Sequence, residues 1–410
     1  YRLRVVKTMV GGLAGLLAHR GITVFRANAA FHADETAPAT SNHIVHLVPS
    51  PDQSDILTYH KADVPEPSGP TMDLTATNIV IATGAKPRPL PGNPFAGALI
   101  DSTQALEVNE FPSSAVIIGA GAIALEFASM WNAAGSKVTL LIRKDRVLSA
   151  WDRRAGTTLT RELKRHGVNI ITRASVTHVD TGANLGATVH YTREGQDGEQ
   201  SVWGEIALVA IGRDPITDPA WGVTIDDHGH VATDAYGRTD KPGVWAVGDV
   251  TAGHALAHRA FEQGIVIAET IAGLNPKPVD EATVPQIVFS FPEAASVGLT
   301  VEQAQAREDL IEIKETNYPM LANARMLMSG TAGSLTIVSG CDAANPDTPR
   351  VLGVHMVSQM ASDIIAEAEQ LVGNHVPLAD AARLVHPHPT FSETLGEALL
   401  KADGRPLHTR

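Results

Sequence analysis

The stretch Ala115-Val-Ile-Ile-Gly-Ala-Gly-Ala-Ile-Ala-Leu-Glu126 decides the fold of this chain. Its first four residues are small or apolar and predict a buried parallel strand, and the residues that follow predict a helix through Trp131. Between them, Gly119 allows a tight turn, Gly121 allows backbone to approach a pyrophosphate, and Ala124 lets helix and strand pack closely. The helix N-terminus then faces the phosphates. The stretch therefore predicts a dinucleotide-binding unit.

A second apolar run, Lys137-Val-Thr-Leu-Leu-Ile142, follows where such units place their next strand. A lone GxGxxA motif also occurs as a glycine turn in ordinary α/β proteins, and this is the alternative interpretation. Because a strand stands on each side of the turn and helix, the pattern favours nucleotide binding.

The length, composition and net charge of the chain limit the partners that it can have. The chain has 410 residues, which suits two to four domains and a sizeable core, with 44% hydrophobic and 19% charged residues. A net charge of −13 gives no general attraction to nucleic acid or anionic lipid, so neither partner is expected. The apolar runs fall far short of the ~20 residues that a membrane span needs.

The cysteine count bears on the redox compartment of the protein, and the N-terminal residues bear on its targeting. Cys341 is the only cysteine, so no intrachain disulfide can form, which suits a reducing cytoplasm. The N-terminus reads Tyr1-Arg-Leu-Arg and lacks the apolar core of a signal peptide. It also lacks an initiator Met, so we expect the chain to begin inside a larger protein.

Three segments together resemble the two-dinucleotide-binding flavoprotein disulfide reductases, the class I pyridine nucleotide-disulfide oxidoreductases. They are Ala82-Thr-Gly84, Thr239 to Asp249, and His388-Pro-Thr-Phe-Ser-Glu393. Within that family the chain is most similar to dihydrolipoamide dehydrogenase. The stretches that carry this similarity are Leu256-Ala-His-Arg-Ala, Ser296-Val-Gly-Leu-Thr, Leu352-Gly-Val-His-Met and His386-Pro-His-Pro-Thr-Phe-Ser-Glu.

The resemblance implies an α/β fold with two Rossmann-like dinucleotide-binding domains, the FAD-binding one incomplete, and a C-terminal α+β dimerisation domain. The expected domains are a partial FAD-binding domain at 1–101, an NAD(P)-binding domain at 102–222, a second FAD-binding or central segment at 223–281, and an interface domain at 282–410. We expect the interface domain to form a homodimer. The strand Leu352 to Val357 and a helix whose apolar stripe is Ile364, Ile365, Ala368 and Leu371 motivate this expectation.

The resemblance also implies an FAD site. Asp249, at the end of a strand, would accept a sugar hydroxyl, while Gly248 admits the ligand. The alternative for Asp249 is a helix N-cap that follows a strand. The other residues that the resemblance places at FAD are Thr83, Gly84, Leu256, Ala257 and His258.

A nicotinamide nucleotide is the second implied cofactor, and Glu126 would contact its carboxamide. In the dehydrogenase the strand after the glycine turn usually ends in an acidic residue that holds a ribose hydroxyl. Here Ile142 stands at that position, and the cations after it suit a 2′-phosphate, which favours NADP over NAD. The alternative is a solvated cationic turn. The residues expected at this nucleotide are Gly119, Gly121, Ala124, Glu126, Arg143, Lys144 and Gly212.

The resemblance further implies a catalytic pair of His388 and Glu393. Histidine has a pKa near working pH, and a carboxylate on one ring nitrogen leaves the other for proton transfer. Without the family, a His-Pro sequence is more often a loop residue. His386 is expected to serve packing or hydrogen bonding. We expect no metal site.

Two parts of the family pattern are missing from the 410 residues: the first glycine-rich βαβ unit for the FAD pyrophosphate, and a Cys-x-x-x-x-Cys pair. Cys341 falls in a stretch that reads as a polar loop, Gly340-Cys-Asp-Ala-Ala-Asn-Pro, and is expected to be an incidental thiol. The predicted function is an FAD-dependent NAD(P)H dithiol/disulfide oxidoreductase with cysteines outside this sequence, a lipoyl-type substrate and, as a partner, a 2-oxoacid dehydrogenase complex. The alternatives are a truncated non-catalytic fragment, or an NAD(P)H oxidase or quinone reductase.

Overall fold

The computed structural model describes residues 1–32, 42–59, 65–182 and 186–409, which form two compact units. The first unit combines residues 1–85 with 215–279, and the second combines 86–214 with 280–410. The glycine turn and the His388–Glu393 segment therefore belong to the same unit. The chain passes from one unit to the other in two short strands, β8 (Ala85–Pro87) and β17 (Arg213–Pro215). These two strands pair with each other.

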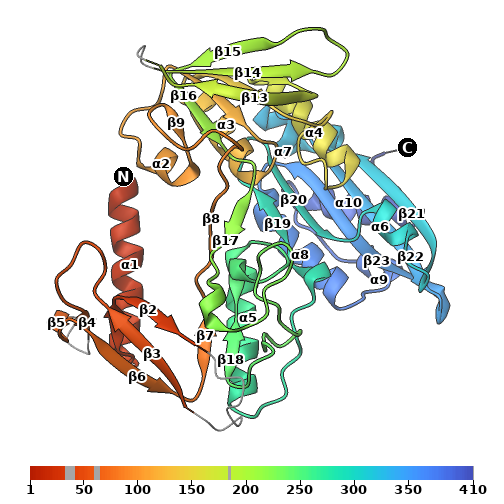
Figure 1. Cartoon of the computed structure of the whole chain (residues 1–410). Helices are drawn as coiled ribbons and strands as arrows, with labels where there is room; N and C mark the ends of the chain where they lie inside the picture. The colour runs from red at the N-terminus through yellow and green to blue at the C-terminus, as the bar shows by residue number, and fades with distance from the viewer. Residues whose placement is uncertain (33–41, 60–64, 183–185, 410) are drawn as a thin grey trace. The chain divides into compact units, whose positions relative to one another are not determined.

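The predicted strand, turn and helix lie at the centre of a five-stranded sheet in the second unit (Figure 1). β10 (Ser114–Ile118) pairs in parallel with β11 (Lys137–Leu141) on one side and with β16 (Ile206–Val209) on the other. The strand order is β12-β11-β10-β16-β9, which confirms the predicted α/β unit. The other elements of this half are β9 (Leu99–Ile100), α2 (Ser102–Glu107), α3 (Ala122–Ala133), α4 (Arg153–Arg165) and β12 (Asn169–Ile171).

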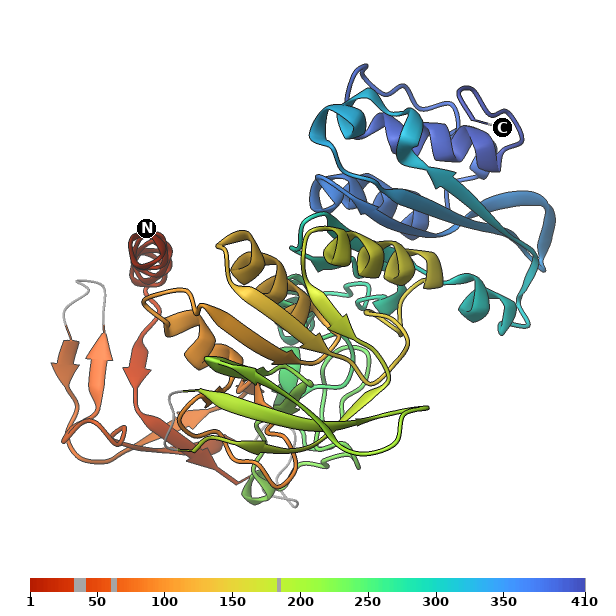
Figure 2. The same cartoon turned by 90° about the horizontal axis from the view of Figure 1, so that it is seen from above.

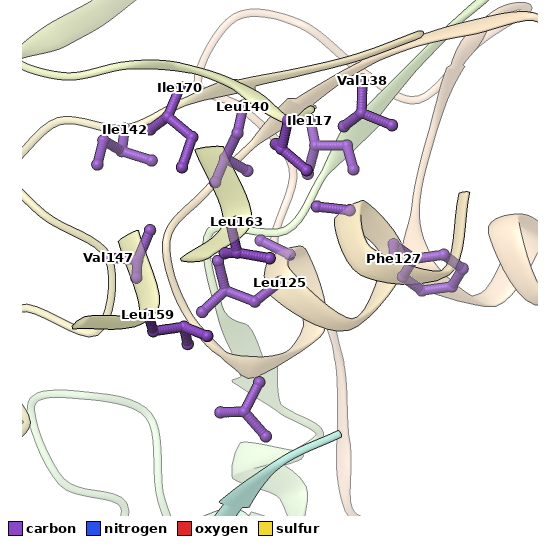
Figure 3. Close-up of a cluster of buried hydrophobic side chains, with 14 of the residues drawn as sticks. Ile117, Leu125, Phe127, Val138, Leu140, Ile142, Val147, Leu159, Leu163 and Ile170 are labelled. Carbon is purple, nitrogen blue, oxygen red and sulfur yellow. The ribbon is translucent and has the colours of Figure 1, made fainter. Parts of the chain in front are cut away.

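The continuous apolar character of β10 follows from burial on both of its faces, as parallel sheets require. On one face, Ile117 and Leu140 pack against Leu125 of α3 and against Leu159 and Leu163 of α4 (Figure 3). Complete burial of one such side chain contributes about 1.5–3 kcal/mol. This core fixes the glycine turn at the edge of the sheet.

A three-stranded antiparallel sheet covers the other face of the parallel sheet. Its order is β13-β14-β15, with β13 at Ala174–Asp180, β14 at Ala187–Arg193 and β15 at Gln200–Gly204. Val189 and Tyr191 of β14 are buried against the parallel sheet. The alternate residues face away from this core, as the period of two in a strand requires, and apart from the exposed Trp203 of β15 those of β14 and β15 are polar.

The C-terminal half of the second unit is an α+β layer, as predicted. Its antiparallel sheet has the order β19-β20-β23-β22-β21, and the sheet lies between the C-terminal helices and α4 (Figure 2). The strands are β19 (Gln286–Val288), β20 (Glu293–Gly298), β21 (Leu310–Pro319), β22 (Ser334–Asp342) and β23 (Asn345–Ser358). The helices are η3 (Glu281–Thr283), α6 (Val301–Gln305), η4 (Met320–Ala322), α7 (Ala324–Ser329), α8 (Ala361–Gly373), α9 (Leu378–Ala381) and α10 (Glu393–Ala402).

The apolar residues that motivated a dimer interface belong instead to the core of this half. Ile364, Ile365, Ala368 and Leu371 of α8 are buried against the face of the sheet that carries Val354 and Met356. Residues 352–357 lie in the C-terminal half of β23, which pairs with β20 on one side and β22 on the other. These residues stabilise the domain itself, so an interface has to use other side chains.

Cys341 does not lie in a polar loop, and that prediction is wrong. It is part of β22, where it pairs with Ile311 of β21, and its side chain is fully buried. The Gly, Asp and Asn residues around it read as a loop, but β22 and β23 continue as a long ribbon through that region.

We therefore expect Cys341 to resist alkylation in the folded protein. Burial raises the pKa of its thiol, so little of the reactive thiolate is present near neutral pH. Treatment with iodoacetamide followed by peptide mass mapping should leave Cys341 unmodified until denaturant is added. Fast labelling without denaturant would show that this strand opens.

The first unit contains a long N-terminal helix, small antiparallel sheets and one parallel strand pair. β7 (Ile79–Ile81) pairs in parallel with β18 (Val244–Ala246), in the register Ile79 to Val244. α5 (Ala257–Ile271) follows β18. The other elements are α1 (Arg2–His19), β1 (Val24–Arg26), β2 (Asn28–Phe31), β3 (His43–Val48), β4 (Leu57–Tyr59), β5 (Pro65–Pro67), β6 (Met72–Ala76), η1 (Pro219–Trp221) and η2 (Gly248–Val250). Among the described residues, no helix is both long and apolar enough to cross a membrane.

Candidate active site

The turn between β10 and α3 has the backbone geometry of a phosphate cradle. Gly119 has φ of +144°, and a Cβ at this position would lie 2.2 Å from the carbonyl oxygen of Ala210. The N–H of Gly119 donates to the carbonyl of Leu141 on β11, at 3.1 Å. Ala124 is completely buried where α3 meets the sheet. Only glycine fits at residue 119, and a small residue is required at 124.

Gly121 leaves the N-terminus of α3 open. It is the N-cap of the helix, no side chain caps the first turn, and a Cβ at Gly121 would meet no atom within 4 Å. The first N–H groups of a helix have no partner within the helix and carry partial positive charge. The cradle therefore fits the pyrophosphate of a dinucleotide.

A cavity of about 530 Å³ opens beside this turn, at the carboxyl ends of β10 and β11. Gly119, Arg143 and Lys144 line it. Both cations are exposed, and neither forms an ion pair with any residue that the structure describes, whereas the adjacent Asp145 pairs with Arg146 at 3.1 Å. Two unpaired cations beside a phosphate cradle can bind a further anionic group.

Ile142, between β11 and these cations, is fully buried in the apolar core and presents no atom to the cavity. The neighbouring residues Leu141 and Arg143 line it instead. Sequence reasoning missed Arg88, which also lines the cavity and donates from Nε to Asp214 Oδ1 at 2.7 Å. Arg88 reaches the cavity from the linker before β9, and no local motif indicates this placement.

Glu126 and Gly212 lie near the nucleotide turn but do not line this cavity. Glu126 Oε1 accepts a hydrogen bond from the backbone N–H of Phe289 at 3.1 Å. Burial raises the pKa of Glu126, and the bond from Phe289 acts in the opposite direction. Gly212 has φ of +128°, and its carbonyl accepts from the N–H of Arg88 at 3.1 Å.

In the first unit, the end of β18 presents a free carboxylate. Gly248 is buried with φ of +76°, and its N–H donates to Gln263 Oε1 of α5 at 3.0 Å. Asp249 follows in a half-buried position, and its carboxylate has no hydrogen-bond partner among the described residues. It does not cap α5, whose N-cap is Leu256. A half-buried acceptor without a partner fits a ligand hydroxyl, such as a flavin sugar hydroxyl.

The remaining residues predicted at the flavin surround the same strand pair. Leu256 is half-buried, and Ala257 and His258, the first residues of α5, are exposed. Thr83 Oγ1 donates to the carbonyl of Ile216 at 2.6 Å, and Gly84, with φ of +70°, accepts from the N–H of Ile216. Thr83 and Gly84 thus hold Ile216, just after the chain re-enters the first unit at residue 215, beside the end of β7.

His388 and Glu393 form a hydrogen-bonded pair, in which Nδ1 of the imidazole lies 2.8 Å from Oε2 of the carboxylate. The His388 side chain is 76% exposed and that of Glu393 is 17% exposed, so the pair presents one ring nitrogen, Nε2, to solvent. Glu393 is the first residue of α10. An imidazole held this way can accept or deliver a proton at Nε2.

Asn323 fixes the orientation of this pair, and sequence reasoning missed it. Its buried Nδ2 donates to Glu393 Oε1 and to the carbonyl of Thr390, both at 2.9 Å. Its Oδ1 accepts from the N–H of Met326 at the start of α7. The sequence shows only an N-cap asparagine; the contact with a residue 70 positions away comes from the fold.

His386 has the structural role that was predicted. Its Nε2 lies 2.9 Å from Glu367 Oε1 of α8, and the hydrogen bond that the imidazole donates to this carboxylate raises the pKa of His386. Gly396 of α10 lies against the ring, since a Cβ there would be 2.4 Å from His386 Nδ1. His386 therefore anchors the loop that carries His388.

Comparison with known proteins identifies the family. The sequence model described as pyridine nucleotide-disulphide oxidoreductase matches residues 4–264, and the model of the dimerisation domain of these proteins matches residues 284–399. A dihydrolipoyl dehydrogenase of Cupriavidus necator is 38% identical over 341 residues, which cover 82% of this chain and 70% of the relative. A dihydrolipoyl dehydrogenase of Geobacillus stearothermophilus is 31% identical over 413 residues, covering 100% of this chain and 80% of the relative.

The fold agrees with this assignment. The crystal structure of LpdA from Mycobacterium tuberculosis superposes with a TM-score of 0.76 at 25% identity, covering 91% of this chain and 76% of that one. The predicted resemblance and the predicted combination of an α/β nucleotide-binding fold with a C-terminal dimerisation domain are confirmed. The chain belongs to the pyridine nucleotide-disulphide oxidoreductases, a family of enzymes that depend on FAD and NAD(P).

Proposed function

We propose that the complete protein transfers electrons between NADPH and a dithiol–disulfide substrate of the lipoyl type. The observation that carries the proposal is the His388–Glu393 pair, because a carboxylate on Nδ1 leaves Nε2 free to take the proton of a substrate thiol. The relatives named dihydrolipoyl dehydrogenase support this substrate class. A 2-oxoacid dehydrogenase complex carrying lipoyl groups is the proposed partner, and the cytoplasm the proposed location.

Different residues of this chain would bind the nicotinamide nucleotide and FAD. Gly119 and Gly121 hold the pyrophosphate of the nicotinamide nucleotide, and Arg143 and Lys144 hold its 2′-phosphate. Asp249 holds a sugar hydroxyl of FAD, which when bound relays electrons between the nucleotide and a disulfide. Cys341 is buried in β22 and cannot exchange with a substrate. We therefore propose that the redox cysteines come from residues of the complete protein outside these 410.

The experiment that tests the function is a substrate comparison on the complete flavoprotein. NADPH oxidation is measured with lipoamide, glutathione disulfide, a quinone or oxygen as the acceptor, in separate assays. We expect lipoamide to give the highest kcat/KM, and the reaction to be blocked when the reduced enzyme is alkylated. Equal turnover with quinone or oxygen that survives alkylation would instead establish an oxidase or quinone reductase.

Asp249→Asn should weaken FAD retention while leaving the fold intact. The amide has the shape of the carboxylate but loses its charge, and a hydrogen bond to a charged group contributes about 1.5–3 kcal/mol. Flavin absorbance after dialysis measures the loss, and Asp227→Asn, at an exposed residue, is the control. Equal flavin content in both variants would remove Asp249 from the site.

We also propose that the family's dimerisation domain joins two copies of this chain through the loop before His388. Leu384 is 48% exposed and Val385 is 95% exposed, directly beside the anchored His386. Two consecutive exposed apolar side chains, within the part of the chain that matches the family's dimerisation domain, support this location.

Val385→Glu should therefore raise the dimer dissociation constant at least tenfold, because a charge in an interface loses its hydration. Sedimentation velocity across a concentration series measures the shift. Ile44→Glu places the same charge on another exposed apolar residue, in the first unit, and should leave the dimer unchanged. Equal behaviour of the two variants would exclude this loop from the interface.

A further inference from the structure

We propose that the outer face of the β13-β14-β15 sheet binds one divalent transition-metal ion of the zinc–copper class, through His178, His190 and Asp180 with Glu199 beside them. This site is separate from the nucleotide cavity and from the His388–Glu393 pair. The proposal does not depend on the proposed function, and no pattern of metal-ligand spacing in the sequence indicated it.

Strand pairing brings the four side chains to one face. His178 of β13 and His190 of β14 are directly opposite each other in the antiparallel register. Asp180 lies two residues after His178, and Glu199 lies two residues before Ser201, the β15 partner of His190. Because side chains alternate across a strand with a period of two, all four project from the side opposite the buried Val189 and Tyr191.

The side chains are already close enough to share an ion. The two imidazole rings stack with centroids 4.1 Å apart and planes within 7°. His190 Nε2 lies 3.1 Å from Asp180 Oδ2, and His178 Nε2 lies 4.0 Å from the same oxygen. One ligand atom of each of these three residues lies within 4.8 Å of the other two. Ligands about 2.0–2.2 Å from a tetrahedral zinc stand about 3.3 Å apart, so small rotations complete the site.

Glu199 is an orienting partner for both histidines, because it faces their Nδ1 atoms while Asp180 faces their Nε2 atoms. Its two carboxylate oxygens lie 3.7 Å from Nδ1 of His178 and from Nδ1 of His190. Thr177, the extra residue at the register shift in β13, donates from Oγ1 to Glu199 Oε1 at 2.7 Å. A carboxylate on the second nitrogen of a metal-binding histidine fixes its tautomer and increases its basicity.

The charge balance of the cluster favours a cation. Asp180 and Glu199 form ion pairs only with these two histidines, and no Lys or Arg of the described chain reaches them. Because a histidine binds a metal ion as the neutral imidazole, the metal-binding form of the cluster has two carboxylate charges and no Lys or Arg counterion, on a chain of net charge −13. Two imidazole nitrogens with carboxylate oxygens suit Zn²⁺ and Cu²⁺, whereas Mg²⁺ and Ca²⁺ prefer all-oxygen sites.

Binding of Zn²⁺ to chelator-treated complete protein, in competition with a chromogenic zinc chelator, tests the proposal. We expect one equivalent per chain at this site, with affinity reduced at least tenfold in His178→Gln and in Asp180→Asn. His46→Gln is the matched control, since His46 is an exposed strand histidine bound to a single carboxylate, Asp73, at 2.6 Å. Its zinc affinity and stoichiometry should equal those of the wild type.

Cu²⁺ offers a second readout that does not depend on affinity. The electron paramagnetic resonance spectrum of the first Cu²⁺ equivalent should show two imidazole nitrogens, and only one in His190→Gln. Circular dichroism of each variant before metal addition confirms folding. The proposal is overturned if the folded His178→Gln and Asp180→Asn proteins bind zinc as the wild type does, since binding would then be adventitious among the other histidines.

Discussion

Replacing His388 with Gln lowers kcat for oxidation of dihydrolipoamide by the complete enzyme by about 100- to 10,000-fold, the contribution typical of a general acid or base. Glutamine can still donate a hydrogen bond to Glu393 Oε2, but it cannot take a proton at the position of Nε2. The thiol of the substrate would then have to lose its proton to water. Steady-state kinetics with dihydrolipoamide measure the loss.

Two controls separate proton transfer from general damage. His408→Gln changes a similar exposed pair, in which His408 Nδ1 lies 2.9 Å from Glu397 Oε1, and should leave kcat unchanged. Electron transfer from NADPH to ferricyanide requires no thiol proton and should survive in His388→Gln. Loss of the ferricyanide reaction as well would show that His388 supports the flavin or the fold, and would refute its assignment as the base.

The arrangement around His388 shows where prediction from the sequence ends. The pair itself could be predicted because His388 and Glu393 are five residues apart in one motif. The hydrogen bond from Asn323 to Glu393 could not, because it joins the start of α7 to the start of α10. The same holds for Arg88, which reaches the nucleotide cavity from a linker.

The fold was predictable where one local pattern dominates. The apolar run of β10 and the glycines after it specify strand, turn and helix with little help from the rest of the chain. β20 could not be predicted from its own residues, because Glu293-Ala-Ala-Ser-Val-Gly298 contains small residues with weak strand preference and its pairing with β23 decides its structure. Cys341 was misplaced for the same reason, since polar and glycine residues at the end of β22 are held in a strand by their neighbours in the sheet.

Changing Arg143 to Glu should lower kcat/KM for NADPH about ten- to a hundredfold and raise the relative use of NADH. The guanidinium lines the nucleotide cavity and has no carboxylate partner among the described residues, so a 2′-phosphate can bind it bidentately. A charge-assisted pair contributes about 1.5–3 kcal/mol, and solvent exposure of Arg143 moves the effect toward the lower end. Steady-state kinetics with both nucleotides give the ratio.

The control for net charge is Lys137→Glu, which makes the same change at the exposed opposite end of β11. If the two variants lower NADPH use equally, the effect is a long-range one of charge and not a contact. If the wild-type enzyme already prefers NADH, the cations after β11 are a solvated turn and NADP selectivity is refuted. A contact requires a loss specific to NADPH at Arg143, because NADH lacks only the phosphate that this side chain would bind.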